Sequence, residues 1–512
     1  MPLLPGPSIL SGSAAPVGPG EEAAEIFTDL NLGQVVGAAV RGREGYDLAP
    51  FFSAPLQDPA AIVYRQRVCA ELEDPGVRRL VEAFAAAMRA VHGSIERSRR
   101  AGYRYQKLAW HLDAAALYAA AVERLAGDLG AAGVRSDGLR ALAAYLVAYT
   151  SSEPFRWLVG EVGSLRAELA RISYALAIRG PRIAVRRYAG EPDYSAEVER
   201  TFERFRQAGS RTYDFEARPH EGVNPLEEQI LDQVVQLWPE PFARLRALAE
   251  RADAFPDPTV LRFEREVQFL LAYLDLLAPL REAGLSVCYP TVVAEGREYS
   301  ARDTYDLPLA LALGHRPGQV VPNDILLSGN ERVLVVTGPN QGGKTTFART
   351  MGQLPYLARL GLPVPGRDAR LPLCDRVFTL FEQAERSESL RGRLEGELVR
   401  ARQILRAASP RSLLVLNESF SGTSLHDATF LGRAVLDEIL RRGAIAVYVT
   451  FVDELSRIDP AVVSLVSTVS PEDPTVRTFR VVRAVADGRA FATAIAAKYG
   501  LTYARLRGPA TA

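Results

Sequence analysis

The chain has 512 residues, of which 48% are hydrophobic and 24% charged, and its formal net charge at pH 7 is zero. This composition is typical of globular proteins, the length predicts two to four domains, and the neutral charge excludes a global attraction to nucleic acid or anionic membranes. Three widely spaced cysteines, no signal-peptide pattern and no apolar run of membrane-spanning length lead us to expect a cytoplasmic protein without disulfides or a membrane partner.

The first part of the chain is expected to be a helical region that follows a disordered tail. Residues 1–24 are rich in proline, glycine, serine and alanine, which predicts disorder. From about residue 25 to 300, apolar residues recur at three- and four-residue spacings, which predicts helices. The clearest stretches are Val77–Val91, Ala114–Leu129, Gly163–Ala177 and Phe263–Leu280. A small irregular insertion is expected near 180–225, where Arg182–Tyr188 alternates like a short strand.

The pattern changes at about residue 300. Short apolar segments now alternate with helical ones, and the strands are expected at Arg332–Thr337, Leu413–Leu416 and Ala444–Val449. Such an alternation is typical of a sheet covered by helices. The predicted fold is therefore a helical body followed by an α/β nucleotide-binding domain over residues 301–512.

The first of these strands leads into a phosphate-binding motif. The segment Gly338-Pro339-Asn340-Gln341-Gly342-Gly343-Lys344-Thr345, followed by Thr346, fits G-x-x-x-x-G-K-[ST]. The backbone N–H groups of such a loop, together with the positive end of the next helix, bind phosphates, and the lysine adds a compact mobile charge. Because the chain has three lysines against 58 arginines, a lysine at this position is informative. We expect residues 338–346 to bind a nucleotide.

A second nucleotide motif is expected about 70 residues downstream. The apolar segment that begins at Arg411 ends in Asn417 and Glu418. In nucleotide hydrolases the first acid of this pair supports Mg²⁺, and the second orients or deprotonates the attacking water. Glu418 suits the catalytic role. Asn417 offers an oxygen but no charge, so that with Thr345 it would hold Mg²⁺ less firmly. The alternative is a buried strand whose Asn and Glu only cap its end.

With these motifs in place, the chain resembles the MutS family of mismatch-repair ATPases, a branch of the ABC-type ATPases. The matching segments are Thr337–Thr346, Pro363–Pro365 ahead of Cys374–Thr379, Asn417–Ser424, Thr450–Leu455 and Ala494–Leu501, with Ile26–Leu32 and Tyr64–Val68 upstream. The resemblance covers about residue 25 to the end. It implies a helical lever and core region over 25–300, an ABC-type P-loop ATPase domain over 301–512, ATP and Mg²⁺ as cofactors, and a homodimer with composite ATP sites.

The chain also differs from the family at functional positions. Family members have Asp-Glu where this chain has Asn417-Glu418, and Thr-His where it has Thr450-Phe451. Phenylalanine cannot donate the hydrogen bond by which that histidine senses the γ-phosphate. The family's Ser-Thr-Phe signature is missing between Ser389 and Glu397, where Arg391 or Arg393 could act on the partner's ATP, or could simply begin a solvated helix. We therefore expect ATP binding with slow or conditional hydrolysis.

The sequence says less about DNA contact. Only about two dozen residues precede the lever-like region, and no Phe-x-Glu stands there, so mismatch reading by the family's N-terminal domain is not expected. Two basic segments with interleaved aromatic residues suit phosphate contacts with stacking. Their candidate residues are Arg97, Arg99, Arg100, Arg104 and Lys107 in the first, and Arg186 and Arg187 in the second. The alternative for each is a solvated surface whose arginine stems lie on apolar neighbours.

The sequence thus predicts an ATP-dependent clamp on double-stranded DNA that acts in DNA repair or in mismatch or recombination surveillance. The alternative hypothesis is a nucleotide-dependent switch that holds a protein partner, hydrolyses little ATP and does not recognise mismatches.

Overall fold

The computed structural model describes residues 6–11, 24–191, 222–251, 255–314, 316–382, 392–473 and 475–486. The chain forms two compact units. The helical unit contains Pro75–Val134 and Leu142–Glu264, and the α/β unit contains Pro5–Asp74, Arg135–Ala141 and Arg265–Ala512. Along the sequence, a helical region precedes a mixed α/β region, as the sequence predicts.

The helical unit is built on two long helices that pack along each other, α5 (Pro75–Arg100) and α6 (Arg104–Ala132). Their buried side chains recur every three or four residues, which is how an amphipathic helix meets a core. The other helices are α8 (Glu153–Ala170), α10 (Pro225–Leu237) and α11 (Pro239–Arg251), while α7 (Asp137–Thr150) and α12 (Pro258–Glu282) contribute residues to both units. The helices predicted over Val77–Val91, Ala114–Leu129 and Phe263–Leu280 are confirmed.

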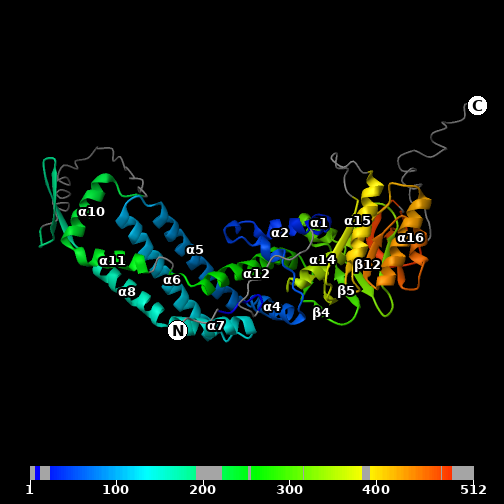
Figure 1. Cartoon of the computed structure of the whole chain (residues 1–512), viewed down its shortest axis with the longest axis horizontal. Coiled ribbons are helices and arrows are strands. Elements are labelled where there is room, and N and C mark those ends of the chain that lie inside the picture. Colours follow the sequence, from blue (N-terminus) through cyan, green and yellow to red (C-terminus); the bar gives the residue numbers. More distant parts are fainter. Residues whose placement is uncertain are drawn as a thin grey trace, which may run out of the picture. The chain divides into compact units, whose positions relative to one another are not determined.

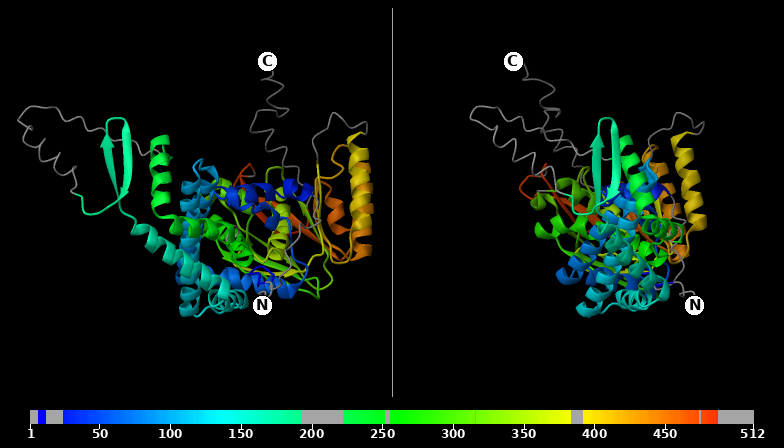
Figure 2. Two further views of the ribbon diagram at one scale, coloured as in Figure 1. Left: turned by 60° about the vertical axis from the view of Figure 1, so that its left-hand side comes forward. Right: turned by 90° about the vertical axis from the view of Figure 1, so that its left-hand side faces the viewer.

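An antiparallel hairpin follows α8. Its strands are β1 (Tyr174–Arg179) and β2 (Arg182–Arg187), joined by a tight turn in which Gly180 has φ +59°. The predicted strand after Arg182 is confirmed, but the predicted helix over Gly163–Ala177 is wrong at its end, because α8 stops at Ala170. Tyr-Ala-Leu-Ala-Ile alternates with period two, and pairing with β2 decides its conformation. The hairpin lies beside α10 (Figure 2).

The centre of the α/β unit is a six-stranded sheet in the order β10-β11-β12-β7-β13-β14. Its strands are β7 (Val333–Thr337), β10 (Val377–Phe381), β11 (Leu413–Asn417), β12 (Ile445–Val449) and β13 (Val462–Val469), all parallel, and the antiparallel edge strand β14 (Arg477–Arg483). The three strands predicted from apolar runs are confirmed.

Helices cover both faces of this sheet (Figure 1). Helix α14 (Lys344–Arg359) packs on β11 and β12, and α15 (Arg393–Ala407) and α16 (Leu425–Arg442) close the core on the opposite face. Because both faces are covered, the central strands are apolar at nearly every position, which explains why continuous apolar runs mark them in the sequence.

Smaller elements complete the α/β unit. A four-stranded sheet has the order β4-β9-β5-β6, and β3 pairs with β8. The bounds are β3 Val287–Cys288, β4 Thr291–Val293, β5 Tyr299–Thr304, β6 Asn323–Leu327, β8 Val364–Pro365 and β9 Asp368–Pro372. The helices are α1 Ala24–Asp29, α2 Leu32–Val40, α3 Ala49–Phe52, α4 Pro59–Glu71 and α13 Leu307–Leu313, with short 3₁₀ turns at Glu44–Tyr46, Pro317–Gln319 and Asp453–Arg457.

Part of the predicted disordered tail is ordered. Ile9 and Leu10 are fully buried, and the Glu266 carboxylate accepts hydrogen bonds from the Ser8 hydroxyl at 2.7 Å and from the Ile9 amide at 2.9 Å. Arg65 donates to the Leu10 carbonyl oxygen at 2.9 Å. The expectation of disorder is therefore wrong for residues 6–11, because two apolar side chains and a set of long-range hydrogen bonds outweigh the local composition. The rest of residues 1–23 lies outside the described ranges.

Candidate functional site

The predicted phosphate loop connects the end of β7 to the first residue of α14. Glycine is required at two of its positions for different reasons. Gly343 caps α14 with φ +91°, and Gly338 has φ +114°. A Cβ atom on Gly338 would also lie 2.7 Å from the Ser467 carbonyl oxygen of β13. The loop therefore combines left-handed backbone with a close approach of the neighbouring strand, and only glycine satisfies both.

Lys344 is buried at the start of α14, with 5% of its surface exposed. Its Nζ donates to the Gly338 carbonyl oxygen at 2.9 Å, to the Pro339 carbonyl oxygen at 3.2 Å and to Asn340 Oδ1 at 3.2 Å. Burial lowers the pKa of Lys344 below its ordinary value, the charge of Glu418 raises it and the charge of Arg477 lowers it further. The ammonium group is thus held among oxygen acceptors of the loop, which phosphate oxygens can replace.

The two predicted Mg²⁺ ligands lie together. Thr345 Oγ1, in the first turn of α14, donates to Asn417 Oδ1, at the end of β11, over 2.8 Å. Glu418 follows directly, and its backbone has φ +51°. Lys344, Thr345 and Glu418 line one cavity of about 680 Å³, together with Gln341, Gly343 and Thr346. Residues that are up to 77 positions apart in the sequence therefore meet at the carboxyl edge of the parallel strands, where α/β proteins bind ligands.

Part of the cavity lining was not predicted. It includes the apolar side chains of Val321, Ile325 and Phe479 and the cation Arg477. Arg477 Nε donates to the Asn340 carbonyl oxygen of the phosphate loop at 3.3 Å, across 137 residues of sequence. Phe479 has φ +57°, and its Cδ1 atom lies 3.7 Å from the Cβ position of Gly343. A positive φ at an aromatic residue is uncommon and marks constrained backbone.

The positions at which the sequence differs from the MutS pattern lie at the same edge of the sheet or outside the described residues. Phe451 is the second residue after β12 and is 48% exposed, whereas Thr450, which follows the strand directly, is buried. Arg391 lies outside the described residues. Arg393 is the first residue of α15, but its side chain is also outside the described part. The proposed action of these two arginines on a partner's ATP stays a prediction.

In the first basic segment, the aromatic residues face the protein core. Tyr103 and Tyr105 are buried, and the Tyr103 hydroxyl donates to Asp232 at 2.9 Å. The guanidinium of Arg104 lies over the ring of Tyr105 at 4.4 Å. The expectation that these tyrosines stack on bases is therefore wrong, because their rings complete the hydrophobic core of the helical unit. The arginine stem on an apolar neighbour, which was the alternative interpretation, describes Arg104.

The other residues predicted to contact DNA differ in whether their side chains already interact with other groups of the protein. Arg97 lies over the Trp110 ring at 4.1 Å, and the Arg187 guanidinium donates to the Leu237 carbonyl oxygen at 2.5 Å. Exposed cations remain on both segments, namely Arg99, Arg100 and Lys107 on the first and Arg186 on the second. Of these, Arg99 and Arg100 form ion pairs with Glu96, at 4.0 and 2.9 Å. Surface pairs of this kind are weak, so that these cations stay available to phosphates.

Within the described ranges, no helix has both the length and the apolar composition needed to cross a bilayer. The same ranges contain no group of three or more His, Cys, Asp or Glu side chains arranged to bind a metal.

Comparison with known proteins agrees with the geometry of the site. Residues 334–509 match the family model for MutS domain V. Over these residues the chain is similar to MutS domain V. The matched residues include the predicted phosphate loop and Glu418, which line the cavity, and Asn417, which accepts the hydrogen bond from Thr345.

The chain is similar to several DNA mismatch repair proteins. It is 30% identical to MutS of Shouchella clausii over 251 residues, which cover 46% of this chain and 29% of that protein. It is 34% identical to MutS of Oleidesulfovibrio alaskensis over 146 residues, 28% of this chain and 16% of that protein. It is 37% identical to MSH3 of Phaeosphaeria nodorum over 140 residues, 27% of this chain and 12% of that protein. The chain thus spans less than a third of the length of these relatives.

Proposed function

We propose that this protein binds ATP with Mg²⁺ at the Lys344 loop and uses ATP binding to change its grip on double-stranded DNA. The process served would be DNA repair or mismatch or recombination surveillance, with a homodimer of ABC-type ATPase domains and slow or conditional hydrolysis. One observation carries the proposal: Lys344, Thr345, Asn417 and Glu418 meet beside a cavity of nucleotide size.

The loop residues suit a triphosphate. Phosphate oxygens would take the place of the three oxygen acceptors that now surround Lys344 Nζ. The free N–H groups at the start of α14 add donors and the positive end of the helix dipole. Arg477 supplies a second cation next to the loop. Phe479 and Val321 offer an apolar surface on which a base would lie.

The Thr345 hydroxyl and the Asn417 amide oxygen fit Mg²⁺, because hard oxygen ligands from one or two side chains, completed by water and phosphates, are usual for this ion. Bound Mg²⁺ neutralises charge on the phosphates. Both protein ligands are neutral, so that the ion would be held less firmly than by an aspartate. Glu418 would orient a water molecule or accept its proton. This combination supports binding more strongly than fast turnover.

The DNA part of the proposal has two supports. The relatives are named DNA mismatch repair proteins. The helical unit also presents exposed cations, of which Arg99, Arg100 and Lys107 lie within nine residues of one another. Contacts of this kind follow the phosphate backbone and weaken steeply with salt.

The nucleotide site is tested by binding and turnover measured separately. Lys344→Ala removes a charged donor worth about 1.5–3 kcal/mol, so that the affinity for a fluorescent ATP analogue should fall at least tenfold. Glu418→Gln should leave this affinity unchanged and lower turnover. Unchanged affinity in Lys344→Ala would refute the nucleotide site, and unchanged turnover in Glu418→Gln would remove the catalytic role of Glu418.

The DNA contact is tested with duplex, mismatched, branched and single-stranded DNA at low and moderate salt. We expect the double variant Arg99→Glu with Arg100→Glu to lose its binding to the DNA that the wild-type protein binds. Arg124→Glu is the matched control, because Arg124 is a similarly exposed arginine of the same unit that pairs with Asp128. If wild-type protein binds none of these DNAs at low salt, the DNA part of the proposal is wrong.

That outcome would favour the second candidate, a nucleotide-dependent switch that holds a protein partner and hydrolyses little ATP. The burial of Tyr103 and Tyr105 favours this candidate, because it removes the stacking surface expected next to the basic residues. Neutral Asn417 favours it as well, since binding without turnover is what a weakly held Mg²⁺ would give.

A further inference from the structure

The segment that carries Glu418 has a constrained backbone. Glu418 has φ +51° and Phe420 has φ +63°, so that two residues with side chains occupy the left-handed region within three positions. This region is costly for residues other than glycine and persists only where the surroundings hold it. The direction in which Glu418 points therefore depends on what holds residues 418–420.

Four hydrogen bonds hold these residues. The Glu418 amide donates to the Val449 carbonyl oxygen at 2.9 Å. The Ser419 hydroxyl donates to the Leu380 carbonyl oxygen at 3.1 Å, and the Ser419 carbonyl oxygen accepts from the Tyr448 hydroxyl at 3.4 Å. These three partners belong to the strands β10 and β12. The fourth partner belongs to a helix.

This fourth bond is the shortest and involves a charge. The Phe420 amide donates to Glu397 Oε2, on α15, at 2.7 Å. Phe420 is fully buried and Glu397 is 8% exposed. A buried carboxylate that accepts from a buried amide makes a stronger bond than a neutral acceptor does, and its removal would leave that amide without its acceptor.

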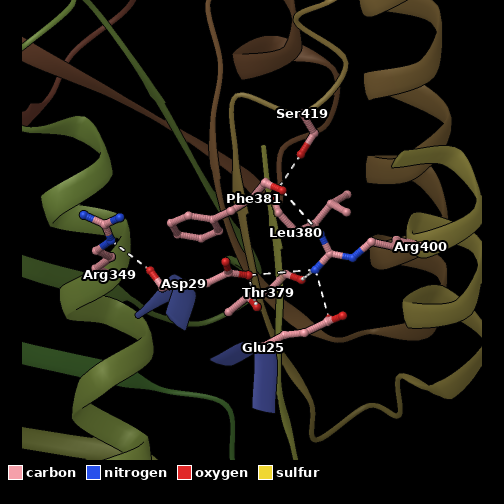
Figure 3. Close-up of polar contacts among 8 residues, drawn as sticks. All are labelled: Glu25, Asp29, Arg349, Thr379, Leu380, Phe381, Arg400 and Ser419. Atoms are coloured by element: carbon pink, nitrogen blue, oxygen red, sulfur yellow. Dashed lines mark hydrogen bonds and ion pairs between the residues drawn. The ribbon is translucent and has the colours of Figure 1, made fainter. Parts of the chain in front are cut away.

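Hydrogen bonds from Arg400 attach helix α15 to β10 and α1. Arg400 lies one turn after Glu397 on the same side of the helix. Its guanidinium donates to the carbonyl oxygens of Thr379 at 3.3 Å and Phe381 at 3.4 Å, and to Glu25 of α1 at 3.0 Å (Figure 3). In the same view, the Ser419 hydroxyl reaches the Leu380 carbonyl oxygen of β10. Glu397 therefore stands at a fixed place relative to the sheet as long as α15 keeps these contacts.

Helix α1 connects this region to the phosphate-loop helix. Asp29 accepts a hydrogen bond from the Thr379 hydroxyl at 2.6 Å through its side chain, and from Arg349 of α14 at 2.8 Å through its carbonyl oxygen (Figure 3). Burial raises the pKa of Asp29 above its ordinary value. Helices α14 and α15 are thus linked through one short helix at the edge of the sheet.

We propose that Glu397 is a positioning residue for Glu418, and that α15 controls the orientation of Glu418 through it. The proposal rests on the proposed catalytic role of Glu418. Because α15 begins at Arg393, where contact with a partner's nucleotide is expected, a displacement of α15 on dimer closure would reach the chain's own Glu418. Hydrolysis in one subunit would then depend on how α15 is placed.

Kinetics on Glu397→Ala and Glu397→Gln test this role. The alanine variant should lower kcat roughly tenfold or more, as expected for loss of a hydrogen bond to a charged group, with KM and ATP-analogue affinity within about twofold of wild type. The glutamine variant keeps a carbonyl oxygen that can accept from Phe420, and should regain most of the turnover. Arg402→Ala, on the exposed side of α15, is the matched control. Equal loss in Ala and Gln, or a raised KM with unchanged kcat, would overturn the proposal.

A second measurement does not need turnover. Amide hydrogen exchange, followed by mass spectrometry, should be faster for residues 417–422 in Glu397→Ala and normal in Glu397→Gln, with residues 338–346 unchanged in both. If wild type binds but does not hydrolyse ATP, the catalytic proposal fails, and this exchange pattern alone decides whether Glu397 holds the segment. Unchanged exchange overturns the inference. Should Glu397→Ala not fold, Glu397→Asp, whose carboxylate is one methylene further from Phe420, takes its place.

Discussion

Gly342→Ala tests how closely the phosphate loop approaches β13. A Cβ atom at this position would lie 2.2 Å from Ser467 Oγ and 3.0 Å from the Pro339 carbonyl oxygen. Ser467 is fully buried, and its hydroxyl donates to the Gly342 carbonyl oxygen at 2.6 Å. The methyl group must therefore displace a buried side chain and break its hydrogen bond. Overpacking costs about 1–3 kcal/mol and the lost bond about 1 kcal/mol, so that the free energy of unfolding should fall by about 2–4 kcal/mol.

The assay is urea unfolding of the full chain, together with the affinity for an ATP analogue. Ser467→Gly removes the obstructing side chain, so that in the double variant part of the loss should be recovered, with a coupling energy of at least about 1 kcal/mol. Gly127→Ala, in α6, is the control, because nothing lies within 4 Å of its Cβ position and helix propensity favours alanine. Wild-type stability in Gly342→Ala, or a double variant that shows no coupling, would refute the described loop geometry.

Two further predictions concern the metal ligands and pH. Asn417→Asp places a charge next to Thr345, so that the Mg²⁺ concentration that half-saturates turnover should fall several-fold, and an unchanged titration would count against Mg²⁺ binding there. The hydrogen bond from His92 to Glu264 raises the pKa of His92 above 6.5. Its stabilising effect is complete below about pH 6.5 and is lost as pH rises through the raised pKa. In urea unfolding, the free energy of unfolding of His92→Gln should therefore change less with pH in this range than that of the wild type. The same pH dependence in both proteins would contradict this role of His92.

Local sequence signals predict part of the fold and part of the candidate site. The buried strands were predictable because a parallel sheet covered on both faces needs continuous apolar runs, and the loop was predictable because phosphate binding fixes glycine and lysine spacings. Thr345 meets Asn417 because the loop after β7 and the carboxyl end of β11 lie at the same edge of the parallel sheet.

Other contacts had no local signal. Arg477 and Phe479 reach the cavity from the edge strand β14, and nothing in their neighbourhood marks a ligand site. Glu397 looked like one more charge at the start of a polar helix, because its partner is a backbone amide 23 residues away. Tyr103 and Tyr105 had the right composition for nucleic-acid stacking, but packing of the helical unit turned their rings inward. Packing between distant elements decides such cases, and periodicity does not encode it.

The contacts of Ser8 and Ile9 with Glu266 have a consequence for how the protein is made. These residues leave the ribosome before their partner, which follows 258 residues after Ser8. At about 5–20 residues per second, roughly 15–50 s pass before Glu266 is synthesised. Arg65, which donates a hydrogen bond to the Leu10 carbonyl oxygen, has a second acceptor, the Leu360 carbonyl oxygen, that is synthesised later still. During that interval the apolar pair Ile9 and Leu10 lacks the contacts that bury it in the folded protein, so that this segment can take its place only late in folding.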